Sequence, residues 1–170
     1  GLGALAGEET ATATLFAMKR RRPSVSLPVL VDSAETARGL IGVDDDAFWR
    51  LAERFWPGPL TIVTTRGPGV DLALGGEVST VGLRCPDHPL ARSLLARTGP
   101  LAVTSANRSG EPPATSAEEV TRTFGPSLVV LDGGTCDEAP SSVVSLLHDK
   151  VRILREGPIG EEAIRAVLGR

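Results

Sequence analysis

Short apolar runs alternate with helix-forming segments along this chain, and this alternation constrains the fold more than any other feature. Runs of strand length lie at 28–31, 60–64, 78–84, 101–103, 128–131, 142–147 and 151–154. Segments that favour helices lie at 8–19, 33–41, 48–55, 87–97, 116–124 and 160–168. Because strands and helices must bury their apolar sides against each other, the alternation predicts an α/β layer architecture.

Two of these helices begin at residues that can cap a helix. Asp87 is expected to cap a helix that runs to Arg97. Three leucines of that helix are expected to face inward, namely Leu90, Leu94 and Leu95. Ser116 and Glu119 have the spacing of a capping box, so another helix is expected to begin at Ser116.

Length and charge set limits on the class of protein. The 170 residues are enough for one domain and contain no interdomain linker, so 1–170 is predicted to be a single domain. The net charge of −3, from 18 basic and 21 acidic residues, does not favour a nucleic-acid binder, although Lys19-Arg20-Arg21-Arg22 is a local basic run. No apolar run approaches the ~20 residues that a bilayer crossing needs.

The cysteines and histidines are few and scattered. Cys85 and Cys136 form no CxxC pair, and His88 and His148 are isolated. This pattern argues against a zinc site and against a histidine-based catalytic triad. The two thiols are expected to be reduced, as in intracellular proteins.

Polar residues follow the apolar run at 101–103. In α/β folds, ligands bind in crevices at the ends of strands. Ser105 and Asn107 are two residues apart, so an extended backbone would point both side chains the same way. The segment therefore predicts a polar pocket, and its alternative interpretation is an Asx or Ser/Thr turn that closes a loop.

The run at 78–84 predicts a strand with one unusual face. Thr80, Gly82 and Arg84 would share that face, because side chains alternate along a strand. A glycine inside a strand often marks the close approach of a ligand or of another backbone. We therefore expect an open floor with a hydroxyl at one end and a guanidinium at the other; the alternative is a partly exposed sheet face.

Further polar candidates lie at the ends of predicted elements. Lys19 and Arg21 flank the end of the first helix, where cations are favoured by the helix dipole or could clamp a phosphate. Ser141 and Arg155 lie at strand boundaries and could be structural or ligand-binding. The sequence contains neither GxxxxGK[ST] nor GxGxxG, which argues against P-loop and Rossmann nucleotide sites.

In combination, these segments resemble the YrdC-like L-threonylcarbamoyladenylate synthases over nearly the whole chain. The matching segments, in order, are Gly1-Leu2-Gly3, Met18-Lys19-Arg20-Arg21, Arg54-Phe55-Trp56-Pro57-Gly58-Pro59-Leu60-Thr61, Thr80-Val81-Gly82-Leu83-Arg84-Cys85-Pro86-Asp87-His88-Pro89, Ser105-Ala106-Asn107-Arg108-Ser109-Gly110, Leu131-Asp132-Gly133-Gly134, Ser141-Ser142-Val143-Val144 and Ile153-Leu154-Arg155. Each segment alone is a weak signal, whereas their ordered combination is specific.

The resemblance implies a twisted mixed sheet flanked by helices, with a concave, positively charged cavity. It implies a nucleotidyltransferase that converts L-threonine, bicarbonate and ATP, with Mg²⁺, into threonylcarbamoyl-AMP and pyrophosphate for tRNA modification. It also implies a cytoplasmic protein without a membrane segment. The implied further partners are tRNA or double-stranded RNA and the proteins of the threonylcarbamoyl-transfer complex.

The resemblance also assigns roles to residues. The catalytic tetrad would be Lys19, Arg21, Ser105 and Asn107. ATP would contact Arg21, Thr80, Asn107, Thr115 and Arg155. L-Threonine would be held by Arg84, Ser105 and Ser141. The family has a Pro-Thr-x-Thr-like strand before Gly-Leu-Gly, and this sequence begins after it, so an exposed sheet edge is expected.

Three other functions compete with the synthase. The first is a carbamoyl-adenylate-forming domain like that of hydrogenase-maturation carbamoyltransferases, whose zinc-finger and acylphosphatase-like segments are not found in this sequence. The second is a double-stranded RNA-binding or ribosome-associated module, which would need a wider basic surface than one four-residue run. The third is an inactive, truncated paralogue.

Overall fold

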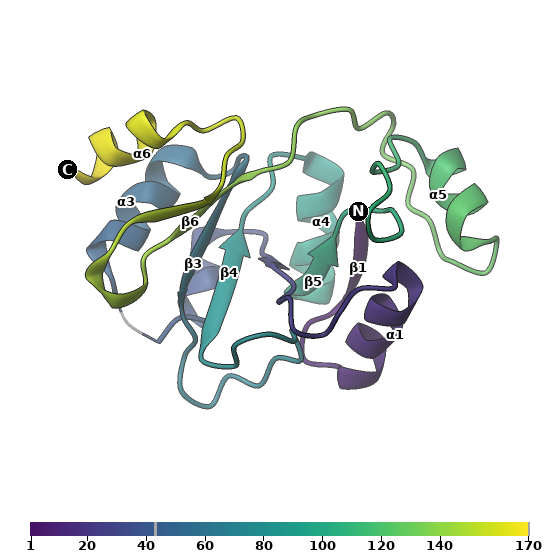
Figure 1. The fold of residues 1–170 in the computed structure, drawn as a ribbon, viewed down its shortest axis with the longest axis horizontal. Coiled ribbons are helices and arrows are strands. Elements are labelled where there is room, and N and C mark those ends of the chain that lie inside the picture. Colours follow the sequence, from purple (N-terminus) through teal and green to yellow (C-terminus); the bar gives the residue numbers. More distant parts are fainter. Residues whose placement is uncertain (43, 170) are drawn as a thin grey trace.

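A mixed sheet forms the centre of the protein in a computed structural model that describes residues 1–42 and 44–169 (Figure 1). In these residues the sheet has seven strands in the order β1-β5-β2-β4-β3-β6-β7. The strands are β1 (Leu2–Leu5), β2 (Val29–Leu30), β3 (Leu60–Thr65), β4 (Thr80–Arg84), β5 (Leu101–Thr104), β6 (Ser142–Ser145) and β7 (Arg152–Arg155). β2 is parallel to β4 and β3 to β6, and the other neighbouring pairs are antiparallel. The predicted α/β class with a mixed sheet is confirmed.

The helices lie between the strands much as their sequence patterns predict. They are α1 (Glu9–Lys19), α2 (Ala34–Arg38), α3 (Asp46–Phe55), α4 (Pro89–Thr98), α5 (Ala117–Phe124) and α6 (Glu161–Leu168), with a short 3₁₀ helix, η1 (Leu147–Asp149). Figure 1 shows α3 and α6 beside each other near the β6 end of the sheet, and α1 and α5 near the β1 end. None of the helices in the described residues combines the length and the apolar composition that a bilayer crossing requires.

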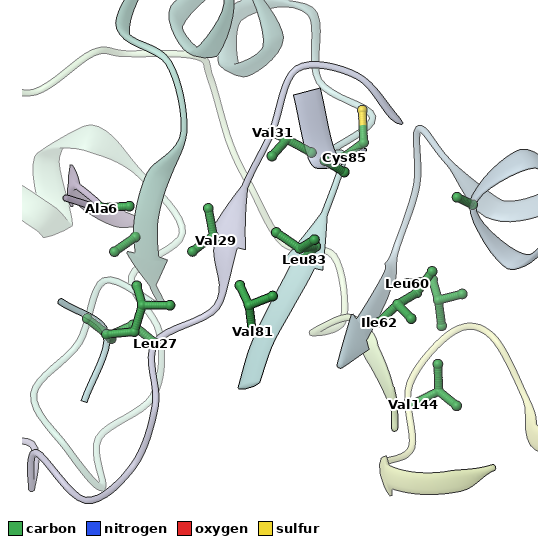
Figure 2. Close-up of a cluster of buried hydrophobic side chains, with 14 of the residues drawn as sticks. Ala6, Leu27, Val29, Val31, Leu60, Ile62, Val81, Leu83, Cys85 and Val144 are labelled. Atoms are coloured by element: carbon green, nitrogen blue, oxygen red, sulfur yellow. The ribbon is translucent and has the colours of Figure 1, made fainter. Parts of the chain in front are cut away.

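One face of the sheet forms the hydrophobic core (Figure 2). Val29, Ile62, Leu83, Ala102 and Val144 are paired across neighbouring strands and are fully buried. Directly paired residues point to the same side of a sheet, so the register alone stacks these side chains into one layer. Apolar residues of α1, α3 and α6 belong to the same cluster, so these helices cover this face. Each fully buried Val, Leu or Ile contributes about 1.5–3 kcal/mol to stability.

The opposite face of β4 carries the polar residues, as predicted. Thr80, Gly82 and Arg84 are half-buried, whereas Val81 and Leu83 between them are buried. A Cβ atom on Gly82 would lie 3.5 Å from Val63 and 3.6 Å from Thr61, which is ordinary van der Waals contact. The neighbouring residues would therefore tolerate a methyl group, and the glycine keeps the floor of this face flat.

Two predictions about strands were wrong. The segment 128–131 was predicted to be a strand, but it pairs with no strand in the described residues, and Val129 and Leu131 are 95% and 56% exposed. An apolar run becomes a strand only when a neighbour satisfies its backbone groups. Conversely, β1 was not predicted, because its glycine-rich sequence is not typical of strands. It forms through antiparallel pairing with β5 and lies at the edge of the described sheet.

The prediction for α4 was also partly wrong. The residue that caps this helix is His88, not Asp87: the Nδ1 atom of His88 accepts the backbone N–H of Ala91 at 3.4 Å. Of the three leucines expected to face inward, only Leu95 is buried, while Leu90 and Leu94 are 36% and 38% exposed. These two leucines line a surface cavity, so the inward face of α4 is narrower than its apolar pattern suggests.

Candidate active site

The buried end of α1 forms the first part of the site. Lys19 is the last residue of α1 and only 3% exposed, and Arg20 ends the helix in the left-handed conformation with φ of 53°. The ammonium group of Lys19 donates to the backbone oxygens of Ser105 and Asn107 at 2.6 and 2.8 Å, and to Oδ1 of Asn107 at 2.8 Å. Oγ of Ser105 lies 3.3 Å from the same nitrogen. The three protons of this ammonium group are therefore all engaged by the segment that follows β5.

Asn107 orders the same segment from its other side. Its Nδ2 donates to the backbone oxygens of Glu111 at 2.6 Å and of Arg108 at 3.0 Å. The hydroxyl of Ser105 donates to Oδ1 of Asn107 at 2.6 Å. The turn interpretation of this segment is therefore confirmed, while the polar pocket stays a prediction. The Ser105 and Asn107 side chains close a loop, and they also gather around a buried cation.

The charge of Lys19 has no counter-ion among the described residues. Every ion pair found there is on the surface, and none involves Lys19, Arg21, Arg84 or Arg155. Burial lowers the pKa of Lys19, and the nearby positive charge of Arg21 lowers it further. An anion placed beside this cluster would relieve the repulsion between the two cations, so the cluster favours an anionic ligand.

Arg21 lies close to Lys19 but is held by a different segment. Its Nε donates to the backbone oxygen of Val25 at 3.3 Å, and a terminal nitrogen donates to that of Ser26 at 3.0 Å. Burial lowers its pKa without removing its charge, since the ordinary pKa of arginine lies far above neutral pH. The turn at 22–26 therefore fixes the position of this guanidinium.

A second group of donors lies at the far end of the polar face. Arg155 of β7 donates two hydrogen bonds of 2.9 Å to Ser141, one from Nε to the backbone oxygen and one from a terminal nitrogen to Oγ. Arg84 donates from Nε to the backbone oxygen of Gly58 at 2.9 Å. Burial is the main cause of the lowered pKa of Arg84; the charge of Glu138 opposes this effect, and the charge of Arg155 adds to it. Two guanidiniums and a hydroxyl therefore face this end of the sheet.

The strand register shows how the two groups are related. β5 runs antiparallel to β2, and β2 runs parallel to β4, which places the end of β5 before Ser105 near the Thr80 end of β4. Arg84 lies four residues further along β4, about 13 Å from Thr80 at ~3.3 Å per residue. Among the described residues no hydrogen bond joins the two groups. A ligand that reaches both would lie along the face of Thr80, Gly82 and Arg84.

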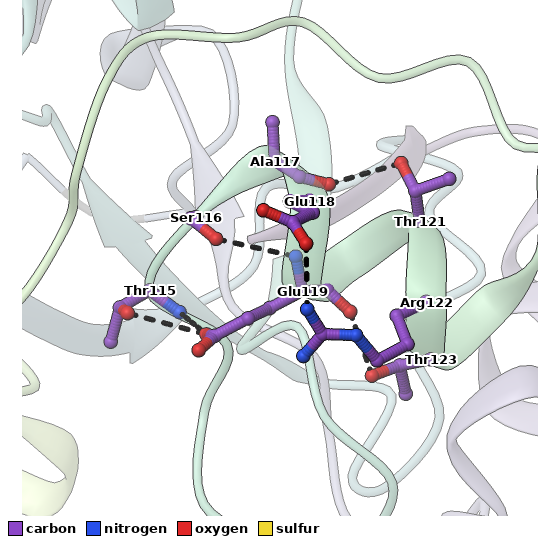
Figure 3. A network of polar contacts seen from close by, with 8 residues as sticks. All are labelled: Thr115, Ser116, Ala117, Glu118, Glu119, Thr121, Arg122 and Thr123. Atoms are coloured by element: carbon purple, nitrogen blue, oxygen red, sulfur yellow. Dashed lines mark hydrogen bonds and ion pairs between the residues drawn. The ribbon is translucent and has the colours of Figure 1, made fainter.

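The segment before α5 is joined to the segment that follows β5, because the backbone N–H of Ala114 donates to the backbone oxygen of Ala106 at 2.8 Å. Thr115 follows Ala114 and lies at the start of α5 (Figure 3). Its backbone N–H and its hydroxyl both donate to Oε2 of Glu119, at 2.7 and 3.2 Å. Ser116 caps the helix by accepting the N–H of Glu119 at 3.2 Å, as predicted. The reciprocal bond of a capping box would go to Ser116, whereas the carboxylate binds the residue before it. Glu119 therefore fixes the orientation of Thr115.

A cavity of about 610 Å³ lies on the other side of Thr115, next to the edge strand β1. Its walls are mostly apolar and include Met18, Leu90, Leu94 and Leu131. Of the residues predicted to bind substrates, Thr115 alone lines it, and the others lie outside this cavity. The predicted concave, positively charged cavity stays a prediction.

Two functional candidates were not found from the sequence. The hydroxyl of Thr61 lies 2.8 Å from that of Ser141, and both residues are buried. The carbonyl of Gly58 orients Arg84. Thr61 belongs to a segment that matches the family, but its own sequence context is that of an ordinary strand residue. Only its place on the same face as Gly82 could have drawn attention to it.

Comparisons with known proteins agree with this fold and site. The sequence profile of the Sua5/YciO/YrdC family, described as "Telomere recombination", matches residues 1–157. A relative from Mycobacterium tuberculosis, provisionally named a threonylcarbamoyl-AMP synthase, is 40% identical over 171 residues. The match covers 99% of this chain and 79% of that protein. The Bacillus subtilis threonylcarbamoyl-AMP synthase is 35% identical over 173 residues, covering 99% of this chain and 50% of the relative.

A solved archaeal structure has a similar fold. The crystal structure of Pyrococcus abyssi Sua5 complexed with L-threonine matches with a TM-score of 0.92 and 35% identity, covering 99% of this chain and 51% of that one. The chain thus spans about half the length of that structure. The α/β fold and its polar face define a YrdC-like domain. By the profile match and these identities, the chain belongs to the Sua5/YciO/YrdC family.

The comparisons confirm the resemblance stated from the sequence, and they leave the roles of individual residues untested. The structure brings Lys19, Ser105 and Asn107 into direct contact, and it joins Ser141 to Arg155. Four other predicted site residues form no hydrogen bond with either of these groups among the described residues, namely Arg21, Thr80, Arg84 and Thr115. Their assignment to ATP or L-threonine stays a prediction.

Proposed function

We propose that this chain is an L-threonylcarbamoyladenylate synthase. It would convert L-threonine, bicarbonate and ATP into threonylcarbamoyl-AMP, pyrophosphate and water. The observation that carries the proposal is the close structural match to a Sua5 protein that binds L-threonine. The second support is a group of four cations along one face of the sheet: Lys19 is buried, Arg21 and Arg84 are half-buried, and Arg155 is exposed. None of them forms an ion pair in the described residues.

The proposed reaction needs little acid–base catalysis from the protein. The amine of L-threonine and bicarbonate form a carbamate, and a carbamate oxygen then attacks the α-phosphorus of ATP and expels pyrophosphate. The carbamate and ATP are both anions, so the main tasks are to hold them together and to stabilise the charge that develops on the phosphates. The scarcity of histidine and cysteine in the sequence is compatible with this chemistry.

We assign the individual residues of the two donor groups to different parts of the substrates. Arg84 and Ser141 would bind the carboxylate of L-threonine, because a guanidinium and a hydroxyl are suitable donors for it. Arg21, Arg155 and Asn107 would contact ATP. Lys19 would act by holding Ser105 and Asn107 in place and by its positive charge, since its three protons already have acceptors within the protein.

We propose that Mg²⁺ enters with ATP as part of the substrate. The described residues contain no group of three or more His, Cys, Asp or Glu side chains that could hold a metal ion. Mg²⁺ is commonly bound through substrate phosphates and water with few protein ligands, so no dedicated site is needed. The product would pass to the proteins that transfer the threonylcarbamoyl group to tRNA, and this role supports a cytoplasmic location.

A pyrophosphate-release assay tests the proposal. Wild-type protein with ATP, Mg²⁺ and bicarbonate should release pyrophosphate only when L-threonine is added. Release that requires carbamoyl phosphate in place of L-threonine and bicarbonate would instead identify a carbamoyl-adenylate-forming enzyme. No release with either set of substrates would contradict both.

Two arginines of the same strand provide a matched pair of variants for this assay. Arg155→Ala removes both bonds to Ser141 and should lower kcat/KM by about 100-fold, a loss typical of a charged group that binds the transition state. Arg152→Ala removes an exposed arginine of β7 and should leave kcat/KM unchanged. Equal losses in the two variants would mean that net charge, and not this site, governs activity.

A further inference from the structure

Thr61, Ser141 and Arg155 form a chain of hydrogen bonds next to the proposed L-threonine site, in which the two hydroxyl residues are buried and the arginine is exposed. Oγ1 of Thr61 and Oγ of Ser141 are 2.8 Å apart, and each residue is about 5% exposed or less. A terminal nitrogen of Arg155 donates to the same Ser141 oxygen at 2.9 Å. The Ser141 hydroxyl therefore has two protein partners, and Arg155 occupies one of its two lone pairs.

A count of protons shows that this chain of bonds is incomplete within the protein. The two hydroxyls carry two protons, and one of these protons is shared between the two oxygens. Whichever hydroxyl donates, the described residues offer no acceptor within hydrogen-bond distance for the second proton. A buried donor without an acceptor is unfavourable, so a ligand oxygen at this position would complete the chain.

The surrounding charges show which hydroxyl is expected to reach the ligand. Arg155 is bound to Ser141 itself, and Arg84 lies near enough for the charge of Arg155 to lower its pKa. A ligand oxygen beside Ser141 would be stabilised by both guanidiniums. This arrangement requires Thr61 to donate to Ser141, which leaves the proton of Ser141 free to point outward.

We propose that Thr61 is a positioning residue that makes the hydroxyl of Ser141 a donor to the carboxylate of L-threonine. This inference rests on the proposed function and adds to it a residue that contacts no substrate. Thr61 acts only through Ser141, so removing its hydroxyl should weaken L-threonine binding and leave the chemical step intact.

Steady-state kinetics on three variants test the proposal. Thr61→Val keeps the shape of the side chain and removes the hydroxyl; it should raise KM for L-threonine by about tenfold with kcat within twofold of wild type. Thr61→Ser keeps the hydroxyl and should behave like wild type. Thr64→Val is the matched control, because Thr64 is equally buried on the same strand but pairs with Val81 on the apolar side. It should leave KM unchanged.

A double-mutant cycle shows whether Thr61 acts through Ser141. Thr61→Val combined with Ser141→Ala should raise KM no further than Ser141→Ala alone, because the oriented donor is already lost. Additive effects of the two substitutions would overturn the proposal. So would a KM for L-threonine in Thr61→Val equal to that of wild type, or a Thr61→Ser variant as impaired as Thr61→Val.

Calorimetric titration of L-threonine separates this inference from the proposed function. Dissociation constants for wild type and Thr61→Val should differ by the same factor as their KM values, with melting temperatures within a few degrees of each other. A wild-type protein that neither binds L-threonine nor releases pyrophosphate would overturn the proposed function and this inference with it. A wild-type protein that does both, with an unaltered Thr61→Val, would overturn the inference alone.

Discussion

Lys19 donates hydrogen bonds to both oxygens of Asn107, the backbone oxygen and Oδ1, each at 2.8 Å. The two residues are 88 positions apart in the sequence, so the buried end of α1 is tied directly to the segment that follows β5. A buried cation without a carboxylate partner is costly unless its protons are satisfied, and here backbone and amide oxygens supply that satisfaction. The same contact therefore supports the fold and keeps a positive charge next to the polar face.

Lys19→Ala should reduce stability as well as activity. The oxygens of Ser105 and Asn107 would lose their donor, at a cost of roughly 1–3 kcal/mol in the free energy of unfolding. A loss of stability is expected because the ammonium group is bound within the protein. Urea unfolding and the pyrophosphate assay measure the two effects.

The control for this substitution is Arg22→Ala, which removes a neighbouring exposed cation. It should change the free energy of unfolding by less than about 0.5 kcal/mol. If Lys19→Ala unfolds at the same urea concentration as wild type, its hydrogen bonds do not support the fold as described.

Gly82→Ala should weaken substrate binding without loss of stability. The added Cβ would meet Thr61 and Val63 at ordinary contact distances, so the melting temperature should stay within about 2 °C of wild type. The methyl group would stand on the floor between Thr80 and Arg84 and raise KM for ATP or L-threonine several-fold. Gly58→Ala is the contrasting variant: its Cβ would overlap with the backbone oxygen of Phe55, so it should lower the melting temperature clearly. An unchanged KM in Gly82→Ala would mean that no ligand lies on this floor.

The stability of the protein should depend on pH through Glu119 at the start of α5. Hydrogen bonds from the backbone N–H and then the hydroxyl of Thr115 lower the pKa of Glu119 below its ordinary value. A carboxyl group whose pKa is lower in the folded state stabilises the fold above its unfolded pKa and loses this contribution as the pH falls through its folded pKa. Wild type should therefore be more stable than Glu119→Gln at pH 7, and the difference should vanish as the pH falls below about 4.

Thermal melts of the two proteins between pH 3 and pH 7 measure this difference. Glu162→Gln is a suitable control, because Glu162 lies in the first turn of α6 and its exposed side chain makes no hydrogen bond in the described residues. A constant gap between wild type and Glu119→Gln across this range would show that the carboxylate does not hold Thr115 in solution.

The two thiols should differ strongly in reactivity. Cys85 is 2% exposed, its Sγ donates to the backbone oxygen of Asp32 at 3.2 Å, and burial raises its pKa above the ordinary value. Cys136 is exposed. A thiolate reagent such as iodoacetamide should modify Cys136 under native conditions and Cys85 only after unfolding, as mass spectrometry of labelled peptides would show. Rapid native labelling of a Cys136→Ser variant would contradict the burial of Cys85.

Much of the fold could be predicted from the sequence, because helix and strand patterns are local. The helix predicted at 48–55 and the alternation along β4 depend on neighbouring residues alone, and both predictions are confirmed. The errors occur where a local pattern needs a distant partner. Residues 128–131 have a strand pattern without a neighbouring strand, and β1 has a weak pattern but pairs with β5.

The candidate site divides in the same way. Residue types and spacing singled out Lys19, Ser105 and Asn107, since polar groups at the ends of apolar runs are visible in a sequence. The sequence could not show that Lys19 is fully engaged by the other two, because that depends on how α1 packs beside the end of β5. For the same reason it could not show that Thr61 touches Ser141.

By itself, the sequence determined the α/β class, the main helices and strands, the family and a set of polar candidates, because these depend on short-range periodicity and on ordered motifs. The tertiary structure decided which candidates meet. The parallel pairing of β3 with β6 brings Thr61 to Ser141 across 80 residues, and the end of α1 brings Lys19 to Asn107 across 88. Contacts between segments so distant in sequence form only when the sheet assembles, since its register and the burial of one apolar face specify them together.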